Sequence, residues 1–259
     1  MFERFAYPEY ATNGEKVLTT REGIHRGMLM DIRVYRMKAG ETREFRDAAD
    51  ETALLLLTGE ISFAWESGNE TRERASVFNE NPSCLHLPHR MQARVTARVE
   101  SELLVQRTQN PRDFAAKFYG PDDCACSVAG EGLCGNTAVR AVRTVFDYAN
   151  APYSNMVLGE VVGQPGSWSS YIPHHHPQPE VYYYQFERPE GFGACFIGES
   201  AFKIRHGSFC AIPGGLTHPQ VSAPGYRLYT CWMIRHLDGH PWTQRVDDPE
   251  YAWLLDAKN

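Results

Sequence analysis

The sequence predicts an all-β protein made of two barrels in one chain, with few and short helices. Short β-prone segments separated by turn residues recur along most of the 259 residues, a pattern typical of barrels and sandwiches. The two halves of the chain can also be overlaid as an internal repeat. Only two segments have the capping residues expected of helices, residues 110–118 and 247–255.

In the N-terminal half, strands are predicted where apolar and polar residues alternate. The first is at residues 27–37, followed by turn residues. Residues 52–65 are predicted to form two strands joined at residues 58–60. The remaining strands predicted here are 84–88, 93–97 and 102–106. A helix is predicted at 110–118, where Asn110 is the expected N-cap and Pro111 the first helical residue.

Residues 121–137 are predicted to connect two domains, an N-terminal barrel over residues 1–120 and a C-terminal barrel over residues 138–259. This segment is rich in Gly, Asp and Cys and has no apolar periodicity. Its cysteines lack a clear fourth ligand, so we interpret Cys124, Cys126 and Cys134 as free thiols, with a second metal site as the alternative. The strands predicted after it are 138–146, 156–162, 181–186, 201–204 and 226–234.

The composition is that of a soluble globular protein, with 42% hydrophobic and 22% charged residues. The net charge is −6 and the basic residues are dispersed, so nucleic acid is not an expected partner. The N-terminus lacks a secretory signal, and the longest aliphatic run, residues 53–57, is too short to cross a membrane. Seven scattered cysteines suit a reducing compartment, so we expect a cytoplasmic protein.

A set of histidines and a glutamate in the C-terminal half predicts a metal site. His174 and His176 are two residues apart, so they project from one face of an extended strand, whereas His175 projects from the other. Glu180 leads into the next β-prone run, and His218 follows a Pro-Gly-Gly turn. Three imidazoles and one carboxylate can hold a divalent ion and leave positions open, as catalytic sites do. The alternative is a His-rich surface loop.

The spacing of these residues matches the two motifs of the cupin fold. The first is G-x(7)-H-x-H-x(3)-E from residue 166, and the second is G-x(5)-P-x-G-x(2)-H from residue 207. In the overlaid N-terminal half, Phe45 and Asp47 take the places of the two first histidines, and Ala93 takes that of His218. His86 and His89 flank the equivalent turn and are interpreted as structural. We therefore predict two cupin barrels (double-stranded β-helix or jelly-roll) with one metal.

The C-terminal half resembles a particular family. The segments that carry the resemblance are Gly159-Glu160-Val161-Val162, residues 165–174, Tyr182-Tyr183-Tyr184, Gly191-Phe192, His218-Pro219, Pro224-Gly225-Tyr226 and Asp248-Pro249 with Trp253. They resemble the 5-deoxy-glucuronate isomerase family of bacterial myo-inositol catabolism, two-barrel cupins related to the 5-keto-4-deoxyuronate isomerases. The N-terminal half fits this family in layout, and two segments, 177–179 and 193–206, are shorter than the family pattern.

The resemblance implies a metal-dependent aldose–ketose isomerase that converts 5-deoxy-D-glucuronate to 5-dehydro-2-deoxy-D-gluconate. The implied metal ligands are His174, His176, Glu180 and His218. Zinc is the expected ion, with manganese, iron or nickel as alternatives. A homo-oligomer is the expected assembly. The rival functions are another metal cupin enzyme, such as a different uronate isomerase or a dioxygenase, and a sugar-binding cupin without turnover.

Proton transfer between adjacent carbons also needs an acid or base with a suitable pKa. Strand parity places Tyr182 and Tyr184 on the face of Glu180, although packing in the barrel wall is the alternative for both tyrosines. Glu180 itself, Glu160 and Lys203 are further candidates. Arg140 and Arg143 lie in a segment that resembles the family's and are candidates for binding the substrate carboxylate, with structural ion pairs as the alternative.

Overall fold

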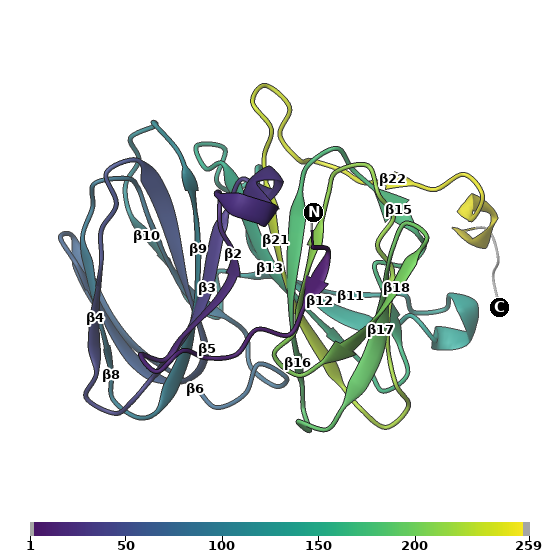
Figure 1. Cartoon of the computed structure of the whole chain (residues 1–259), viewed down its shortest axis with the longest axis horizontal. Coiled ribbons are helices and arrows are strands. Elements are labelled where there is room, and N and C mark those ends of the chain that lie inside the picture. The colour runs from purple at the N-terminus through teal and green to yellow at the C-terminus, as the bar shows by residue number, and fades with distance from the viewer. Residues whose placement is uncertain (1–2, 256–259) are drawn as a thin grey trace.

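The computed structural model describes residues 3–255, and these form two β-barrels side by side (Figure 1). The described helices are three short 3₁₀ turns, η1 (Gly23–Met28), η2 (Cys134–Asn136) and η3 (Ala252–Leu255). The predicted all-β class of two cupin barrels is confirmed. None of these helices is long and apolar enough to cross a membrane.

Two sheets that share one long strand make the N-terminal barrel. The first runs in the order β10-β7-β5-β9-β3-β2, and the second joins β4, β8, β5 and β6. The strand bounds are β2 (Glu15–Thr19), β3 (Asp31–Met37), β4 (Thr42–Phe45), β5 (Asp50–Trp65), β6 (Gly68–Arg74), β7 (Ser83–Leu87), β8 (Ala93–Ala97), β9 (Ser101–Gln109) and β10 (Lys117–Tyr119).

The C-terminal barrel has a seven-stranded sheet in the order β1-β19-β16-β21-β13-β12-β11 and a four-stranded sheet in the order β14-β20-β17-β18. A further pair joins β15 to β22. The bounds are β1 (Phe5–Ala6), β11 (Ala125–Ala129), β12 (Arg140–Phe146), β13 (Met156–Gly163), β14 (Trp168–Ser169), β15 (His174–His175), β16 (Glu180–Phe186), β17 (Phe192–Ile197), β18 (Ser200–Arg205), β19 (Phe209–Ile212), β20 (Gln220–Ser222), β21 (Leu228–Arg235) and β22 (Val246–Asp247).

The two barrels pack face to face through a shared apolar core. Alternate residues of β16 separate the two environments: Val181 and Tyr183 belong to the core shared with the N-terminal half, whereas Tyr182 and Tyr184 face the interior of the C-terminal barrel. Because side chains alternate along a strand, this register also turns Glu180 into the barrel interior. The shared core therefore fixes which side chains can reach the site.

Apolar side chains fill the interior of the N-terminal barrel. Phe45 and Ala93, which take the places of metal ligands in the overlay, are buried there among Leu, Ile and Val side chains. Asp47 accepts hydrogen bonds from the backbone N–H groups of Ala49 and Asp50 instead. His86 lies between the barrels, where its Nε2 atom is 3.0 Å from Oε2 of Glu51 and its ring stacks on Phe146. Nε2 of His89 lies 3.4 Å from Oδ1 of Asp113.

The predicted helix at 110–118 is wrong. Asn110 does accept a hydrogen bond from the backbone N–H of Arg112, but residues 110–116 form no helix or strand. The chain then forms β10, which pairs with β7 through Lys117↔His86. Phe114 meanwhile packs on His86 and Tyr153, with ring centroids 4.9 and 4.7 Å apart. An Asn-Pro pair suits a side-chain-capped turn as well as a helix start, and tertiary packing selects the turn.

Other predicted elements differ in extent. Residues 50–65 form one strand rather than two, and the strand predicted at 27–37 begins at Asp31, after η1. The predicted helix at 247–255 is reduced to η3, because residues 246–247 form β22. β11 lies inside the predicted connection 121–137 and pairs with β12.

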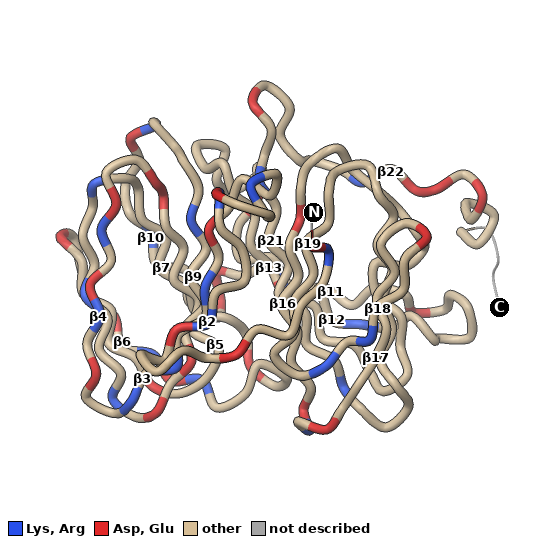
Figure 2. Tube along the Cα trace, viewed as in Figure 1, with Lys and Arg blue, Asp and Glu red and all other residues tan. Residues whose placement is uncertain are grey.

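Charged residues of both signs are interspersed over both barrels (Figure 2). Nucleic acid as an excluded partner stays a prediction, as do the domain boundaries.

Candidate metal centre

A close approach of two loops brings the predicted ligands together. His174 lies on β15, His176 follows it, and Glu180 begins β16. His218 lies between β19 and β20, after a turn whose Gly215 N–H donates to the carbonyl oxygen of His176 at 2.8 Å. A Cβ atom on Gly214 would lie 1.9 Å from the carbonyl oxygen of Pro177, so only glycine permits this approach.

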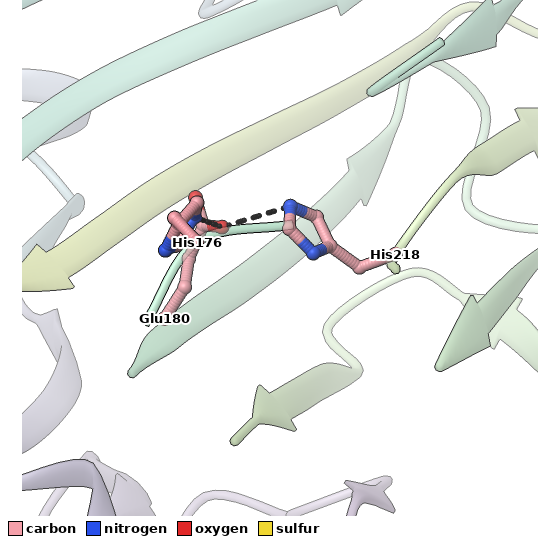
Figure 3. A group of neighbouring side chains, drawn as sticks. All are labelled: His176, Glu180 and His218. Atoms are coloured by element: carbon pink, nitrogen blue, oxygen red, sulfur yellow. Dashed lines mark hydrogen bonds and ion pairs between the residues drawn. The ribbon is translucent and has the colours of Figure 1, made fainter. Parts of the chain in front are cut away.

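Three of the predicted ligands form a tight buried group (Figure 3). Oε2 of Glu180 lies 3.1 Å from Nε2 of His176 and 3.2 Å from Nε2 of His218. One potential ligand atom from each residue lies within 4.8 Å of the others. All three side chains are at most 4% exposed.

The other ring nitrogen of each histidine is held by a backbone carbonyl. Nδ1 of His174 lies 2.9 Å from the carbonyl oxygen of Ile172, and Nδ1 of His176 lies 3.0 Å from that of Gln178. Nδ1 of His218 lies 2.9 Å from the carbonyl oxygen of Leu216. A carbonyl oxygen only accepts, so Nδ1 carries the hydrogen and the Nε2 lone pair of a neutral ring is free, as in metal-binding histidines.

This arrangement fits a divalent cation. Burial lowers the pKa of His218, so its ring is neutral and its Nε2 lone pair faces the carboxylate of Glu180. That Nε2 atom is buried and has no hydrogen-bond partner among the described residues. Nε2 of His176 lies 3.1 Å from the same carboxylate oxygen, so a cation bound here would be within reach of both rings and of the carboxylate. The donor set of imidazoles and a carboxylate suits zinc and other first-row transition metals.

His174 lies beside this group rather than in it. Its ring centroid is 4.9 Å from that of His218, and its side chain lines the adjacent cavity. Burial, together with His218, lowers its pKa to about 2, so the ring is neutral and able to act as a fourth ligand. His175 points away, since it is partly exposed and pairs with Val246 of β22.

A cavity of about 230 Å³ opens beside the histidines. Four buried polar atoms on its lining residues have no hydrogen-bond partner in the described part of the chain: Oε1 of Gln220, Oγ1 of Thr230 and the indole Nε1 atoms of Trp232 and Trp242. Buried polar groups in native proteins nearly always have partners. These donors and acceptors thus belong to residues of the cavity wall and have no protein partner in the described part of the chain.

The position of Trp232 depends on a glycine in the neighbouring strand. Trp232 pairs with Gly159 of β13, and a Cβ atom there would lie 2.2 Å from Cζ2 of the indole. The indole ring therefore lies over the bare backbone of Gly159 and forms one wall of the cavity.

The two candidate tyrosines share a face but not an environment. Tyr182 lines the cavity, and its hydroxyl lies 2.9 Å from Oγ of Ser170. Burial and the charge of Glu180 raise its pKa, so the phenol stays protonated. Tyr184 is fully buried behind it, with its hydroxyl 3.1 Å from Sγ of Cys210, and does not line the cavity.

The two candidate arginines lie in different places. Arg140 lines the cavity and donates to the carbonyl oxygens of Ala138 at 2.7 Å and Tyr171 at 3.0 Å. Arg143 lies in the interface between the barrels, where it donates to Val77 and Glu160. That placement removes Arg143 from the candidates for substrate binding.

Glu160 and Lys203 do not reach the cavity either. Glu160 is fully buried between the barrels, where it accepts two hydrogen bonds of 2.8 Å from Arg74 and one of 2.8 Å from Tyr229. Lys203 is exposed on β18, with Nζ 5.0 Å from the ring centroid of Phe192. Strand parity turns both side chains away from the barrel interior, so neither is an acid or base for chemistry there.

Sequence reasoning missed several lining residues. These are Ser170, Gln220, Thr230, Trp232, Trp242 and Arg245. Trp242 and Arg245 lie between β21 and β22. The only element predicted in this part of the chain was a helix at 247–255, and no local pattern marks the pairing of β22 with β15.

Residues 6–254 match the model of the KduI/IolB family. A 5-deoxy-glucuronate isomerase of Geobacillus kaustophilus is 24% identical over 276 residues, covering 98% of this chain and 96% of that protein. The same enzyme of Geobacillus thermodenitrificans is 24% identical over 87% of this chain and 86% of its own length.

Among solved structures, an IolB-like protein of Salmonella typhimurium superposes with a TM-score of 0.88 at 19% identity, covering 98% of this chain and 99% of that one. An oxalate decarboxylase superposes with a TM-score of 0.65 at 12% identity, over 95% of this chain and 80% of its own, which shows a shared fold.

Proposed function

The chain belongs to the KduI/IolB family of isomerases, and from this premise we propose that it is a divalent-metal-dependent aldose–ketose isomerase. The proposed reaction converts 5-deoxy-D-glucuronate to 5-dehydro-2-deoxy-D-gluconate in myo-inositol catabolism. The cytoplasm is the proposed compartment, and a homo-oligomer the proposed assembly.

One observation carries the metal part of the proposal. The Nε2 atoms of His176 and His218 converge on one oxygen of Glu180 in a buried site, at 3.1 and 3.2 Å. These three residues would hold the ion, with His174 beside them as the fourth ligand. Zinc is the proposed ion, and manganese, iron or nickel would also suit this donor set. When bound, the ion would act as a Lewis acid and polarise a carbonyl group of the substrate.

The cavity walls provide the remaining functions. Tyr182 lines the cavity, and its protonated hydroxyl would donate a hydrogen bond, and then a proton, to a substrate oxygen. Glu180 is the second candidate acid or base, and it would move the proton between the two adjacent carbons. The unpartnered polar atoms of Gln220, Thr230, Trp232 and Trp242 would bind sugar hydroxyls, and Arg140 would bind the carboxylate.

The direct test is to incubate zinc-loaded protein with 5-deoxy-D-glucuronate without oxygen or nicotinamide and to follow the aldehyde signal by NMR. We expect reversible loss of the aldehyde and formation of the ketose. The variant His176→Ala, which removes one proposed ligand, should be inactive. The proposal fails if metal-replete protein isomerises no 5-deoxy- or 4-deoxy-uronate and instead turns over another substrate under oxygen, as a dioxygenase would.

A further inference from the structure

The segment after β21 closes one side of the cavity. This C-terminal strap, residues 236–248, turns back through the bridge Leu237↔His240 and runs beyond β15 (Figure 1). It ends in β22, which pairs with the strand that carries the first metal ligand, in the register His174↔Asp247. The backbone N–H of Asp248 donates to the carbonyl oxygen of Pro173 at 2.9 Å.

Two more contacts fix the strap. Nε2 of Gln178 donates to the carbonyl oxygen of His240 at 2.9 Å, and the backbone N–H of Trp242 donates to Nδ1 of His236 at 2.9 Å. The Trp242 ring centroid lies 6.2 Å from that of His176 and 5.8 Å from that of Trp232. The strap is therefore built into the cavity wall.

The strap brings a second arginine to the cavity. Arg245 and Arg140 both line it, and both also line the neighbouring cavity of about 150 Å³. Arg140 is 7% exposed, and its two hydrogen bonds go to backbone carbonyls rather than to a carboxylate. Arg245 pairs with Asp247 at 2.8 Å. Arg140 is therefore buried with no carboxylate partner among the described residues, whereas the side chain of Arg245 is 37% exposed.

An uncompensated guanidinium is costly to bury. Burial, and then the nearby charge of Arg245, lower the pKa of Arg140 to about 10. An anionic ligand group in the cavity that both arginines line would supply the missing negative charge. Because a guanidinium offers five N–H donors and Arg140 uses two of them on carbonyls, bidentate binding of a carboxylate remains possible.

We infer that Arg245 on the strap, together with Arg140, forms the subsite for the carboxylate of the sugar acid. The carboxylate end of the substrate then lies at the strap, and the reacting carbonyl end lies at His176, Glu180 and His218. This inference rests on the proposed function for its substrate class. It adds Arg245 as a specificity-determining residue and gives the substrate one orientation in the cavity.

The test compares two ligands that differ only in charge at the far end: D-glucuronate and its neutral amide, D-glucuronamide. Their dissociation constants are measured by calorimetry on zinc-loaded protein. We expect the wild type to prefer D-glucuronate, and Arg245→Gln to reduce that preference roughly 10- to 100-fold, the range for a hydrogen bond to a charged group. Arg205→Gln is the matched control, because Arg205 is exposed on β18 and contacts the ring of Tyr7.

Zinc content distinguishes a lost subsite from a displaced strap, and it should stay at one ion per chain in Arg245→Gln. Arg245→Lys retains the charge and should show an intermediate preference. The inference is overturned if the wild type does not distinguish the two ligands, or if Arg245→Gln keeps the wild-type preference. Failure of the isomerase assay alone, with this preference intact, would remove the proposed reaction and leave the subsite.

Discussion

At the scale of single residues, Tyr182 is the proposed proton donor to a substrate oxygen. We expect Tyr182→Phe to lower kcat by roughly 10²- to 10⁴-fold, the usual contribution of general acid catalysis. Tyr184→Phe is the matched control, because its hydroxyl faces Cys210 outside the cavity, and it should retain most activity. Both variants should keep their zinc. Equal losses in the two variants would show that packing, rather than proton donation, explains the effect.

The sequence was most informative about individual residues where a motif spans few positions. His176, Glu180 and His218 could be predicted because strand parity and a short turn determine their positions. The roles of Glu160, Arg143 and Lys203 could not, because the direction of each side chain depends on which sheet face is buried against the other barrel. Arg74 lies 86 residues from Glu160 in the chain, and nothing local signals their pairing.

At the scale of elements, the turn before His218 determines whether the ligand group assembles. We expect Gly214→Ala to weaken zinc binding strongly, because its Cβ atom would displace the Pro177 carbonyl and so separate His218 from His176. Zinc affinity can be measured by competition with a chelator. Gly27→Ala is the control, since a Cβ atom there meets nothing within 4 Å. Unchanged affinity in Gly214→Ala would contradict this account of the turn.

The anchor of the strap should make stability depend on pH. Burial, with Arg235, lowers the pKa of His236 from 6.5 to about 4, and its neutral Nδ1 accepts a hydrogen bond from Trp242. The unfolded chain therefore takes up this proton at higher pH than the folded chain, so stability falls as the pH drops from 6.5 toward 4. Between pH 6.5 and 4, the free energy of unfolding measured with urea should fall by roughly 1–2 kcal/mol less in His236→Gln than in the wild type. An identical loss in both proteins would exclude His236 as its source.

Strands with clear alternation could be predicted closely, as at Ala93–Ala97. Some of the missed elements are two residues long and pair with partners distant in sequence, whereas β6 and β17 are longer and pair with the neighbouring strands β5 and β18. β1 pairs with β19 at the register Phe5↔Cys210, and β22 pairs with β15. Two-residue strands have no periodicity to detect, so only the folded chain reveals them.

At the scale of the whole molecule, the two barrels are joined by a shared core and a buried ion pair. We expect Glu160→Ala to lower the free energy of unfolding by about 3–5 kcal/mol, because it leaves Arg74 buried and uncompensated at 1% exposure. Glu44→Ala, which breaks an exposed pair with Arg94, should cost less than about 1 kcal/mol. Urea unfolding measures both, and similar costs would contradict a stabilising role for the interface pair.

The two-barrel architecture could be predicted from the internal repeat, whereas the way the barrels meet could not. The shared core combines residues such as Leu55 of β5 and Val181 of β16, whose alternation looks the same whether a sheet faces another barrel or a barrel interior. That choice of faces places the metal group in the C-terminal barrel and Glu160 between the barrels.

The central claim is that one metal ion in the C-terminal barrel is required for isomerisation. It is tested most directly by removing metal with a chelator, adding zinc back in steps, and measuring bound zinc and the isomerisation rate together. We predict that the rate rises with bound zinc and levels off at one ion per chain. His175→Ala should behave like the wild type, and His176→Ala should bind no tight zinc. Two tight ions per chain, or full activity in metal-free protein, would contradict the account.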